Sequence, residues 1–236
     1  MNVPKLKRWH KLTYNGDLAN ELQHKLKISP LIAKILVNRG LNTVEEAQLF
    51  LAGDVSSLGS PLQMTGMIRS VNKIKEVIKN KAKVLVYGDY DVDGITSTAL
   101  LYELLKKLGA NVGYHIPERL VEGYGLNFET IKRFGAEGYQ LIITVDCGIS
   151  SVDEVKLANE LAIEVIITDH HEPPVELPKA YSIINPKLDG GKVFDKLAGV
   201  GVAFKLAQAI HLSYGLPEFE QVVAGEYLDL VALGTI

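Results

Sequence analysis

Residues 84–97 read VLVYGDYDVDGITS, and this stretch decides the fold. Its first residues form a short apolar run, which is typical of a β-strand that is covered on both faces. Three carboxylates follow at alternate positions, Asp89, Asp91 and Asp93, and the next residue is a glycine that leads into a helical pattern. Carboxylates this close repel one another and resist burial. Their place at the end of a core strand therefore indicates a cation that offsets their charge.

The alternation of apolar strands with helices continues along the chain. The pattern predicts strands over residues 83–88, 111–117, 140–146, 164–169 and 180–185, with helices over 95–109, 127–138 and 151–162 between them. Two further helical segments are expected over 197–215 and 226–236. Strands that alternate with helices form right-handed βαβ units and a parallel sheet. The sequence thus predicts an α/β fold, with a mostly parallel sheet and helices on both of its faces.

The first part of the chain has a different pattern, which is helical and lacks predicted strands. Helical spacing is found over residues 17–27, 29–40, 42–51 and 65–81. Ser29 before Pro30 suits a helix N-cap and first turn, and Gly40 suits a C-cap. We therefore predict a small helical N-terminal extension over residues 1–81 and an α/β domain over residues 82–236.

Charge is distributed unevenly between these two parts. Residues 1–83 carry 14 Lys and Arg against 6 Asp and Glu, whereas residues 84–236 carry 11 against 22, and the whole chain has a net charge of −3. A basic leading segment suits contact with a polyanion, and an acidic body suits binding of cations. Uneven surface charge without a functional role is the alternative interpretation.

Composition restricts the setting of the protein. The single cysteine, Cys147, excludes an internal disulfide framework, and its apolar surroundings favour a packed core residue. No apolar run is long enough to span a bilayer, and the N-terminus lacks the apolar segment of a signal peptide. We therefore expect no membrane association and a reducing, cytoplasmic location.

Three predicted strands end in groups that bind metals. Asp89, Asp91 and Asp93 follow the first of these strands, and the other groups that follow strands are Asp146, Asp169, His170 and His171. The carboxyl ends of parallel strands meet at one edge of a sheet, where ligands bind. Oxygen donors with some imidazole suit Mn²⁺ or Mg²⁺, whereas zinc usually takes more His or Cys. Each group alone could cap a helix or close a turn, but their joint placement favours a metal site.

The stretch ERLVEGYGLN, residues 118–127, follows a predicted strand at the same edge. Its Arg119 could clamp a phosphate, and its Tyr124 could stack on a base. An ordinary glycine-rich turn with a packed aromatic residue is the alternative.

Two later stretches offer further contacts for a substrate. INPKLDG presents Asn185 and Lys187, and LAGVGVAFK places Gly199 and Gly201 at the start of a helix. Free N–H groups at a helix start attract phosphate. Close helix packing also selects glycine, so the two glycines alone do not decide between these interpretations.

Several of these stretches together resemble the motifs of the DHH phosphoesterase superfamily. The matching segments, in order, are GDYDVDG, EGYGLN, TVDCGIS, TDHHEPP, INPK and LAGVGVAFK. The likeness is greatest to the bacterial single-strand-specific DNA exonucleases of that superfamily. The leading segment SPLIAKILVNRGLNTVEEAQLFL also resembles their helical N-terminal extension, so the resemblance covers roughly residues 28–236.

The resemblance implies a two-metal phosphodiesterase, with Mn²⁺ or Mg²⁺, that releases mononucleotides from the 5′ end of single-stranded DNA in repair and recombination. It implies that Asp91, Asp93 and His170 bind metal and that Asp146 bridges the two ions. His171 is expected to face the scissile phosphate. Asp89 and Asp169 are expected either to bind metal or to support its ligands. A helicase or a single-strand-binding protein is an expected partner of the full-length protein.

The chain differs from this family at its C-terminal end. Members continue into a segment with a fourth-motif aspartate and then into a DHHA1 domain, and the sequence ends at Ile236 before either of them. We therefore expect a truncated catalytic domain. Two alternatives stay open: a DHH phosphoesterase that acts on short oligonucleotides, cyclic dinucleotides or pyrophosphate, and a DHH-fold binding module without catalysis. The basic extension and EGYGLN favour the exonuclease.

Overall fold

The structure is a computed structural model that describes residues 10–53, 58–190, 194, 196–215 and 219–236. The chain divides into two compact units, Met1–Gly59 and Ser60–Ile236. Each unit has its own hydrophobic core. The two units are therefore described separately.

The first unit is helical, as the sequence predicts. It contains α1 (Gly16–Leu26), α2 (Pro30–Asn38) and α3 (Val44–Ala52). Side chains of Asn15, Ser29 and Thr43 accept hydrogen bonds from free N–H groups in the first turns of these helices. The three helices share a small core, formed by Ala19, Leu22, Ala33, Leu36 and Ala47.

The second unit is built on a five-stranded sheet. Its strands are β1 (Lys83–Tyr87), β2 (Asn111–His115), β3 (Tyr139–Val145), β4 (Glu164–Thr168) and β5 (Ser182–Ile184). Their order in the sheet is β2-β1-β3-β4-β5, and all four pairings are parallel. The predicted parallel α/β fold is therefore confirmed.

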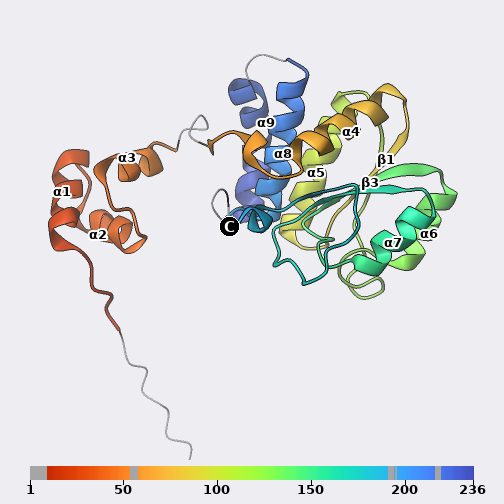
Figure 1. Cartoon of the computed structure of the whole chain (residues 1–236). Helices are drawn as coiled ribbons and strands as arrows, with labels where there is room; N and C mark the ends of the chain where they lie inside the picture. Colours follow the sequence, from red (N-terminus) through yellow and green to blue (C-terminus); the bar gives the residue numbers. More distant parts are fainter. Residues whose placement is uncertain (1–9, 54–57, 191–193, 195, 216–218) are drawn as a thin grey trace, which may run out of the picture. The chain divides into compact units, whose positions relative to one another are not determined.

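Helices cover both faces of this sheet (Figure 1). One layer contains α4 (Met67–Lys79), α5 (Val92–Lys107), α8 (Gly199–Ser213) and α9 (Phe219–Thr235), and the other contains α6 (Phe128–Ala136) and α7 (Val152–Glu160). Alternate residues of β1 pack in two different cores. Val84 and Val86 belong to the first core, which the sheet shares with α4, α5, α8 and α9. Leu85 and Tyr87 belong to the second core, which the sheet shares with α6 and α7. Cys147 is fully buried in the second core, as predicted. Among the described residues, no helix is both long and apolar enough to cross a bilayer.

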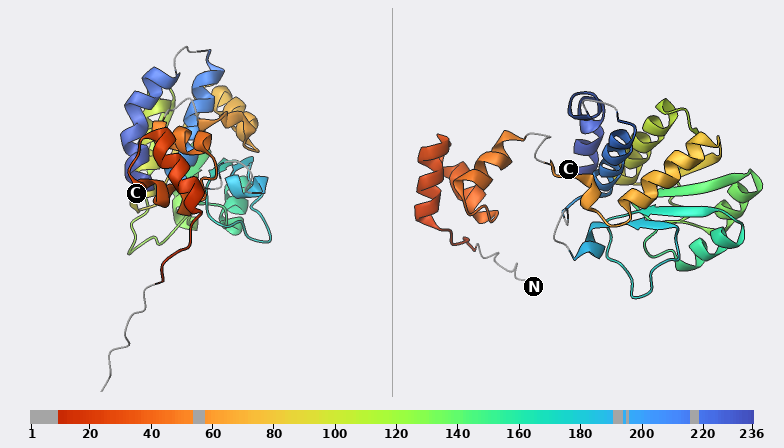
Figure 2. Two further views of the ribbon diagram at one scale, coloured as in Figure 1. Left: turned by 90° about the vertical axis from the view of Figure 1, so that its left-hand side faces the viewer. Right: turned by 45° about the horizontal axis from the view of Figure 1, so that its top comes forward.

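The division between the units lies earlier than the boundary predicted after residue 81. The helical pattern predicts that α4 belongs to the extension, but Val71, Ile74 and Val77 share the first core of the sheet with Val84 and Val86. The 3₁₀ turn η2 (Pro61–Gln63) leads into this helix. The helix is therefore part of the α/β unit, as the second view in Figure 2 also shows.

The sheet order brings the predicted site residues together. Strands β1, β3 and β4 are neighbours in the sheet and run in the same direction, so their carboxyl ends lie side by side. Each of these ends is followed by at least one of the predicted carboxylates. The fold therefore gathers those side chains at a single edge.

Candidate metal centre

The loop after β1 supplies Asp89 and Asp91. Asp89 is only 3% exposed, and its Oδ1 has no hydrogen-bond partner among the described residues. Asp91 is exposed and is the N-cap of α5, where it accepts a hydrogen bond from the Gly94 N–H at 2.9 Å. Gly94 packs directly on the Asp89 backbone, where a Cβ atom would collide. One carboxylate of this loop is thus buried and only partly satisfied, while its neighbour begins the helix.

Strand β3 is followed directly by Asp146, the central residue of the site. Its backbone has φ 61°, which is unusual for a residue other than glycine, and its N–H donates to Thr168 O at 3.0 Å in the neighbouring strand. Asp146 is 2% exposed, and its Oδ1 has no hydrogen-bond partner among the described residues. Burial raises the pKa of Asp146 to about 6, although His170 acts in the opposite direction.

Strand β4 is followed by Asp169, which is satisfied by hydrogen bonds. Its carboxylate accepts from the N–H of Ile149 at 2.9 Å, the N–H of His170 at 2.7 Å and Nδ1 of His171 at 2.7 Å. Burial acts to raise the pKa of Asp169, but these hydrogen bonds outweigh it and hold the pKa below its ordinary value. Asp169 therefore fixes the backbone and the ring of His171.

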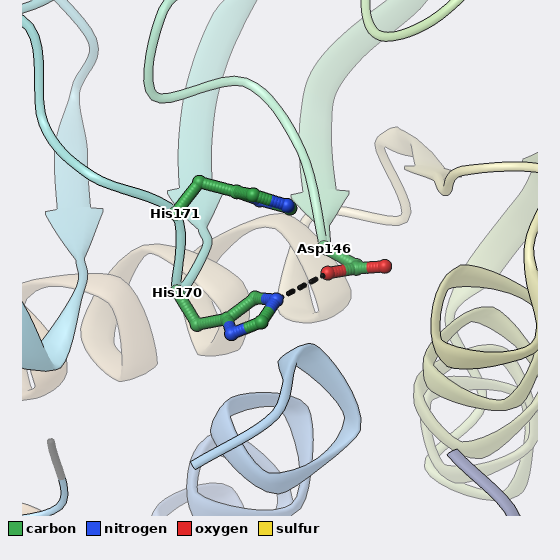
Figure 3. Close-up of side chains that lie close together, drawn as sticks. All are labelled: Asp146, His170 and His171. Carbon is green, nitrogen blue, oxygen red and sulfur yellow. Dashed lines mark ion pairs between the residues drawn. The ribbon is translucent and has the colours of Figure 1, made fainter. Parts of the chain in front are cut away.

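The two histidines point toward Asp146 (Figure 3). His170 Nε2 lies 3.1 Å from Asp146 Oδ1 and 3.7 Å from Asp93 Oδ2. The first distance is that of an ion pair when His170 is protonated. The Asp146 carboxylate raises the pKa of His170, and the Asp169 carboxylate raises that of His171. An imidazole thus faces two carboxylates that belong to different strand ends.

Asp93 has a second role that its sequence pattern does not reveal. Its Oδ2 accepts from the Gly199 N–H at 2.7 Å, and its Oδ1 accepts from the Val200 N–H at 2.6 Å. The carboxylate therefore caps the N-terminus of α8 while it also faces His170. Because a carboxylate oxygen can accept more than one partner, these bonds leave lone pairs free for a cation.

The glycines of LAGVGVAFK are explained by close packing. A Cβ atom at Gly199 would collide with the Asp146 carboxylate, and one at Gly201 would lie 2.9 Å from Leu197 Cδ2. The Gly199 N–H is already donated to Asp93. A phosphate contact at these two glycines stays a prediction, and the structure gives each of them a packing role.

The donor atoms form two groups that share a residue. Asp89, Asp91 and Asp146 form the first group, and Asp146, His170 and His171 form the second. The atoms within each group lie within 4.8 Å of one another. Asp89 and Asp146 both present a buried carboxylate oxygen without a hydrogen-bond partner among the described residues, and a cation would satisfy these atoms. Carboxylates with one or two imidazoles fit Mn²⁺ or Mg²⁺.

The loop between β2 and α6 brings Arg119 and Tyr124 to this edge. The Tyr124 hydroxyl lies 3.4 Å from Asp146 O and 3.3 Å from His171 Nδ1, and its ring contacts His171 edge to face. The Arg119 guanidinium lies over the ring of Tyr90 at 5.2 Å. Both side chains are exposed, so a substrate could reach them. Their predicted contacts with phosphate and base stay predictions.

Asn185 and Lys187 lie beside the same histidines. Asn185 is 1% exposed, donates from Nδ2 to His171 O at 3.0 Å and accepts from the Lys187 N–H at 2.9 Å. Lys187 Nζ pairs with Glu172 at 2.8 Å. Asn185 therefore supports the backbone of His171, and Lys187 is the more accessible of the two. Their role in substrate binding stays a prediction.

One residue with a central position was not singled out from the sequence. Glu122 lies in EGYGLN and accepts hydrogen bonds from several surrounding groups, including the side chains of His115, Asn127 and Thr130. A lone glutamate in a glycine-rich loop looks like a solvated surface residue. Its position two residues before Tyr124 was the available signal.

Fold and site together define a class of protein: α/β proteins in which a parallel sheet presents carboxylates and imidazoles for divalent cations. The chain belongs to the DHH family, because the family model described as "DHH family, N-terminal domain" matches residues 83–235. The match covers all five strands of the sheet together with α5 and α8.

Curated relatives and solved structures agree with this assignment. The chain is 46% identical over 97% of its length to the single-stranded-DNA-specific exonuclease RecJ of Bacillus subtilis and 34% identical over 100% of its length to RecJ of Thermus thermophilus. It spans only 28% and 32% of those two proteins. The structure of T. thermophilus RecJ in complex with Mn²⁺ matches 93% of the chain with a TM-score of 0.74 at 32% identity, and the chain covers 30% of it. A crystal structure of RecJ bound to manganese matches 75% of the chain with a TM-score of 0.68 at 38% identity, and 44% of that structure is covered.

Proposed function

We propose that this site binds two Mn²⁺ or Mg²⁺ ions and hydrolyses phosphodiester bonds of single-stranded DNA. The observation that carries the proposal is the position of Asp146, which belongs to both groups of donor atoms. Its buried Oδ1 has no hydrogen-bond partner among the described residues and faces only the ring of His170, so the carboxylate would be able to hold two cations. The DHH relatives that the chain resembles include RecJ proteins solved with Mn²⁺ or Mg²⁺, which supports the choice of metal.

Different residues of the chain would hold each of the two ions and face the substrate. Asp91 and Asp89 would hold one ion with Asp146, and His170 and Asp93 would hold the other. When bound, the ions would supply an activated water and offset the charge that develops on the attacking and leaving oxygens. His171, held through Nδ1 by Asp169, would present its ring to the scissile phosphate. Tyr124 lies against this ring and limits its movement.

The proposed substrate rests on what the names of the relatives say. RecJ proteins are single-stranded-DNA-specific exonucleases by name, and we propose the same substrate here. We propose that Arg119, whose guanidinium lies over Tyr90, binds a backbone phosphate, a contact that does not depend on base sequence. We further propose digestion from the 5′ end, a role in DNA repair and recombination, a cytoplasmic location, and a helicase or a single-strand-binding protein as the partner that supplies single strands.

The test is a nuclease assay on Asp146→Ala in the longest natural form of the protein, since the chain spans about a third of its relatives. With Mn²⁺ present, we expect loss of release of nucleotides from 5′-labelled single-stranded DNA, by at least about a hundredfold, because both groups of donors lose their shared ligand. Circular dichroism and thermal melting should show a retained fold. The matched control is Asp153→Ala, which removes an exposed carboxylate in the first turn of α7.

The same assays separate the alternatives. Near-normal activity of Asp146→Ala would overturn the assignment of the site. Hydrolysis of a dinucleotide without hydrolysis of single-stranded DNA would identify a phosphoesterase for short substrates. Calorimetric titration with Mn²⁺ that shows no binding to the wild type would favour a binding module without catalysis.

A further inference from the structure

The loop of residues 116–127 carries two side chains to different parts of the metal centre. Tyr124 contacts His171 and the backbone of Asp146, which belong to the β3 and β4 ends. Arg119 lies over Tyr90, which stands between Asp89 and Asp91 at the β1 end. The conformation of this loop therefore decides how the two side chains face a bound substrate.

Glu122 holds the loop from inside. Its Oε2 lies 2.8 Å from Nε2 of His115 and accepts from Asn127 Nδ2 at 3.1 Å and from Thr130 Oγ1 at 2.9 Å. Its Oε1 accepts from the N–H of Glu118 at 3.1 Å. The carboxylate thus joins the end of β2, the start of the loop and the first turn of α6.

The protonation of these groups follows from their partners. Arg133 can only donate, and its Nη2 lies 3.4 Å from Nδ1 of His115, so Nδ1 accepts and the proton of a neutral imidazole is on Nε2. Glu122 therefore receives hydrogen bonds from four donors and is ionised. Burial acts to raise its pKa, but the hydrogen bonds lower the pKa to about 2. An isosteric amide cannot accept from all four donors, because one end of the amide is itself a donor.

A second anchor ties the loop to the strand that carries the aspartates. Tyr87 is the last residue of β1 and is fully buried. Its hydroxyl donates to Gly125 O at 2.9 Å and lies 3.3 Å from Asn127 Nδ2, which also donates to Glu122. Tyr124 is therefore held between an anchor on each side in the sequence. The contacts of Glu122 and Tyr87 form one continuous network.

We propose that Glu122 is a positioning residue for single-stranded DNA: it fixes the loop so that Arg119 and Tyr124 face the phosphate that the metal centre acts on. The inference rests on the proposed function, because it names the part of that site that orients the substrate. Among the described residues, the hydrogen-bond partners of Glu122 include none of the metal donors, and it acts through the two side chains on its loop. Loss of its charge therefore weakens substrate binding and leaves the metal centre intact.

The experiment compares Glu122→Gln with Glu129→Gln in steady-state assays on labelled single-stranded DNA with Mn²⁺. For Glu122→Gln we expect KM to rise about tenfold with kcat within about twofold, since one charge-assisted network is lost outside the reacting groups. Mn²⁺ affinity, measured by calorimetry, should stay within about twofold of wild type, because no metal donor changes. Glu129→Gln changes an exposed carboxylate in the neighbouring helix, which pairs only with Lys132 among the described residues, and should behave as wild type.

A second variant and a second measurement keep the inference testable if Glu122→Gln folds poorly. Thr130→Val removes one of the four donors at nearly constant shape, and we expect about a threefold rise in KM. Hydrogen exchange at the amides of residues 124–126 should become faster in Glu122→Gln and unchanged in Glu129→Gln. This measurement does not need nuclease activity.

Two results would overturn the inference while the proposed function stands: an unchanged KM in a folded Glu122→Gln, or a parallel loss of kcat and Mn²⁺ affinity. The second result would make Glu122 a support of the metal centre itself. An inactive wild type would instead refute the proposed function. In that case unchanged hydrogen exchange in Glu122→Gln would refute the positioning role independently.

Discussion

The carboxylates at the edge of the sheet differ in how their oxygens are satisfied. Asp169 receives several hydrogen bonds and its pKa is lowered, whereas Asp146 keeps an oxygen without a hydrogen-bond partner among the described residues, and burial raises its pKa to about 6. The difference separates a residue that orients a histidine from a residue that is available to a cation. A carboxylate at a strand end is therefore available to a cation only where its neighbours leave some of its lone pairs free.

Glu122 provides a prediction at the residue scale about stability and pH. Its pKa is lowered from an ordinary value of 4.5 to about 2 in the folded state, so the ionised form stabilises the fold. This contribution is fully present above about pH 4.5 and is lost as the pH falls toward 2. We expect Glu122→Gln to melt a few degrees below wild type at pH 7, with the gap closing between about pH 4.5 and 2.

The groups near this carboxylate that can carry charge are the imidazole of His115 and, behind it, the guanidinium of Arg133. The measurement is the thermal melting of the wild type and of Glu122→Gln between pH 7 and about pH 2. Glu129→Gln is the control. A gap that stays constant down to pH 2 would show that Glu122 stabilises the loop through shape and not through its charge.

The start of helix α8 packs directly on the metal centre. Its first two N–H groups donate to Asp93, and Gly199 leaves no room for a Cβ atom beside Asp146. We expect Gly199→Ala to lower the free energy of unfolding by roughly 1–3 kcal/mol, because the helix start or the carboxylate must move. Mn²⁺ affinity should fall as well, and denaturant unfolding and calorimetry measure the two effects.

Gly225→Ala in α9 is the control for this substitution. A Cβ atom at Gly225 meets nothing within 4 Å, so alanine should be neutral or stabilising by up to about 1 kcal/mol. Equal effects of the two substitutions would contradict the close packing of α8 against Asp146.

Local patterns in the sequence predicted most of these elements. Apolar runs such as the one before Asp89 predicted every strand, and caps such as Ser29 predicted helix starts, because both depend on neighbouring residues. The attachment of α4 to the sheet was not predicted, since helical spacing does not say which core a helix joins. Likewise, the bonds from Asp93 to α8 join residues more than a hundred positions apart. Such contacts follow only from the folded arrangement.

The division of the whole molecule leads to a prediction about its parts. All the donor residues of the metal centre lie in Ser60–Ile236, which has its own core. We expect residues 60–236, expressed alone, to unfold cooperatively and to bind Mn²⁺ with an affinity within about threefold of the whole chain. Residues 82–236 should fold poorly, because they lack the side chains that α4 adds to the core.

Calorimetry and thermal melting of the two fragments test this prediction. Equal stability of the two fragments would mean that α4 is dispensable and that the boundary after residue 81 describes the folding unit better. Loss of Mn²⁺ binding in residues 60–236 would assign a role in the site to the first unit.

At Asp146, the stability of the fold and the binding of metal favour different residues. Its φ of 61° is costly for any residue with a side chain, and its buried carboxylate is only partly satisfied without a cation. Glycine at this position would relieve both costs in the metal-free protein and would remove the shared ligand. Selection for thermal stability alone would therefore drive this position away from aspartate, and a stability screen used in engineering must be run with the metal present.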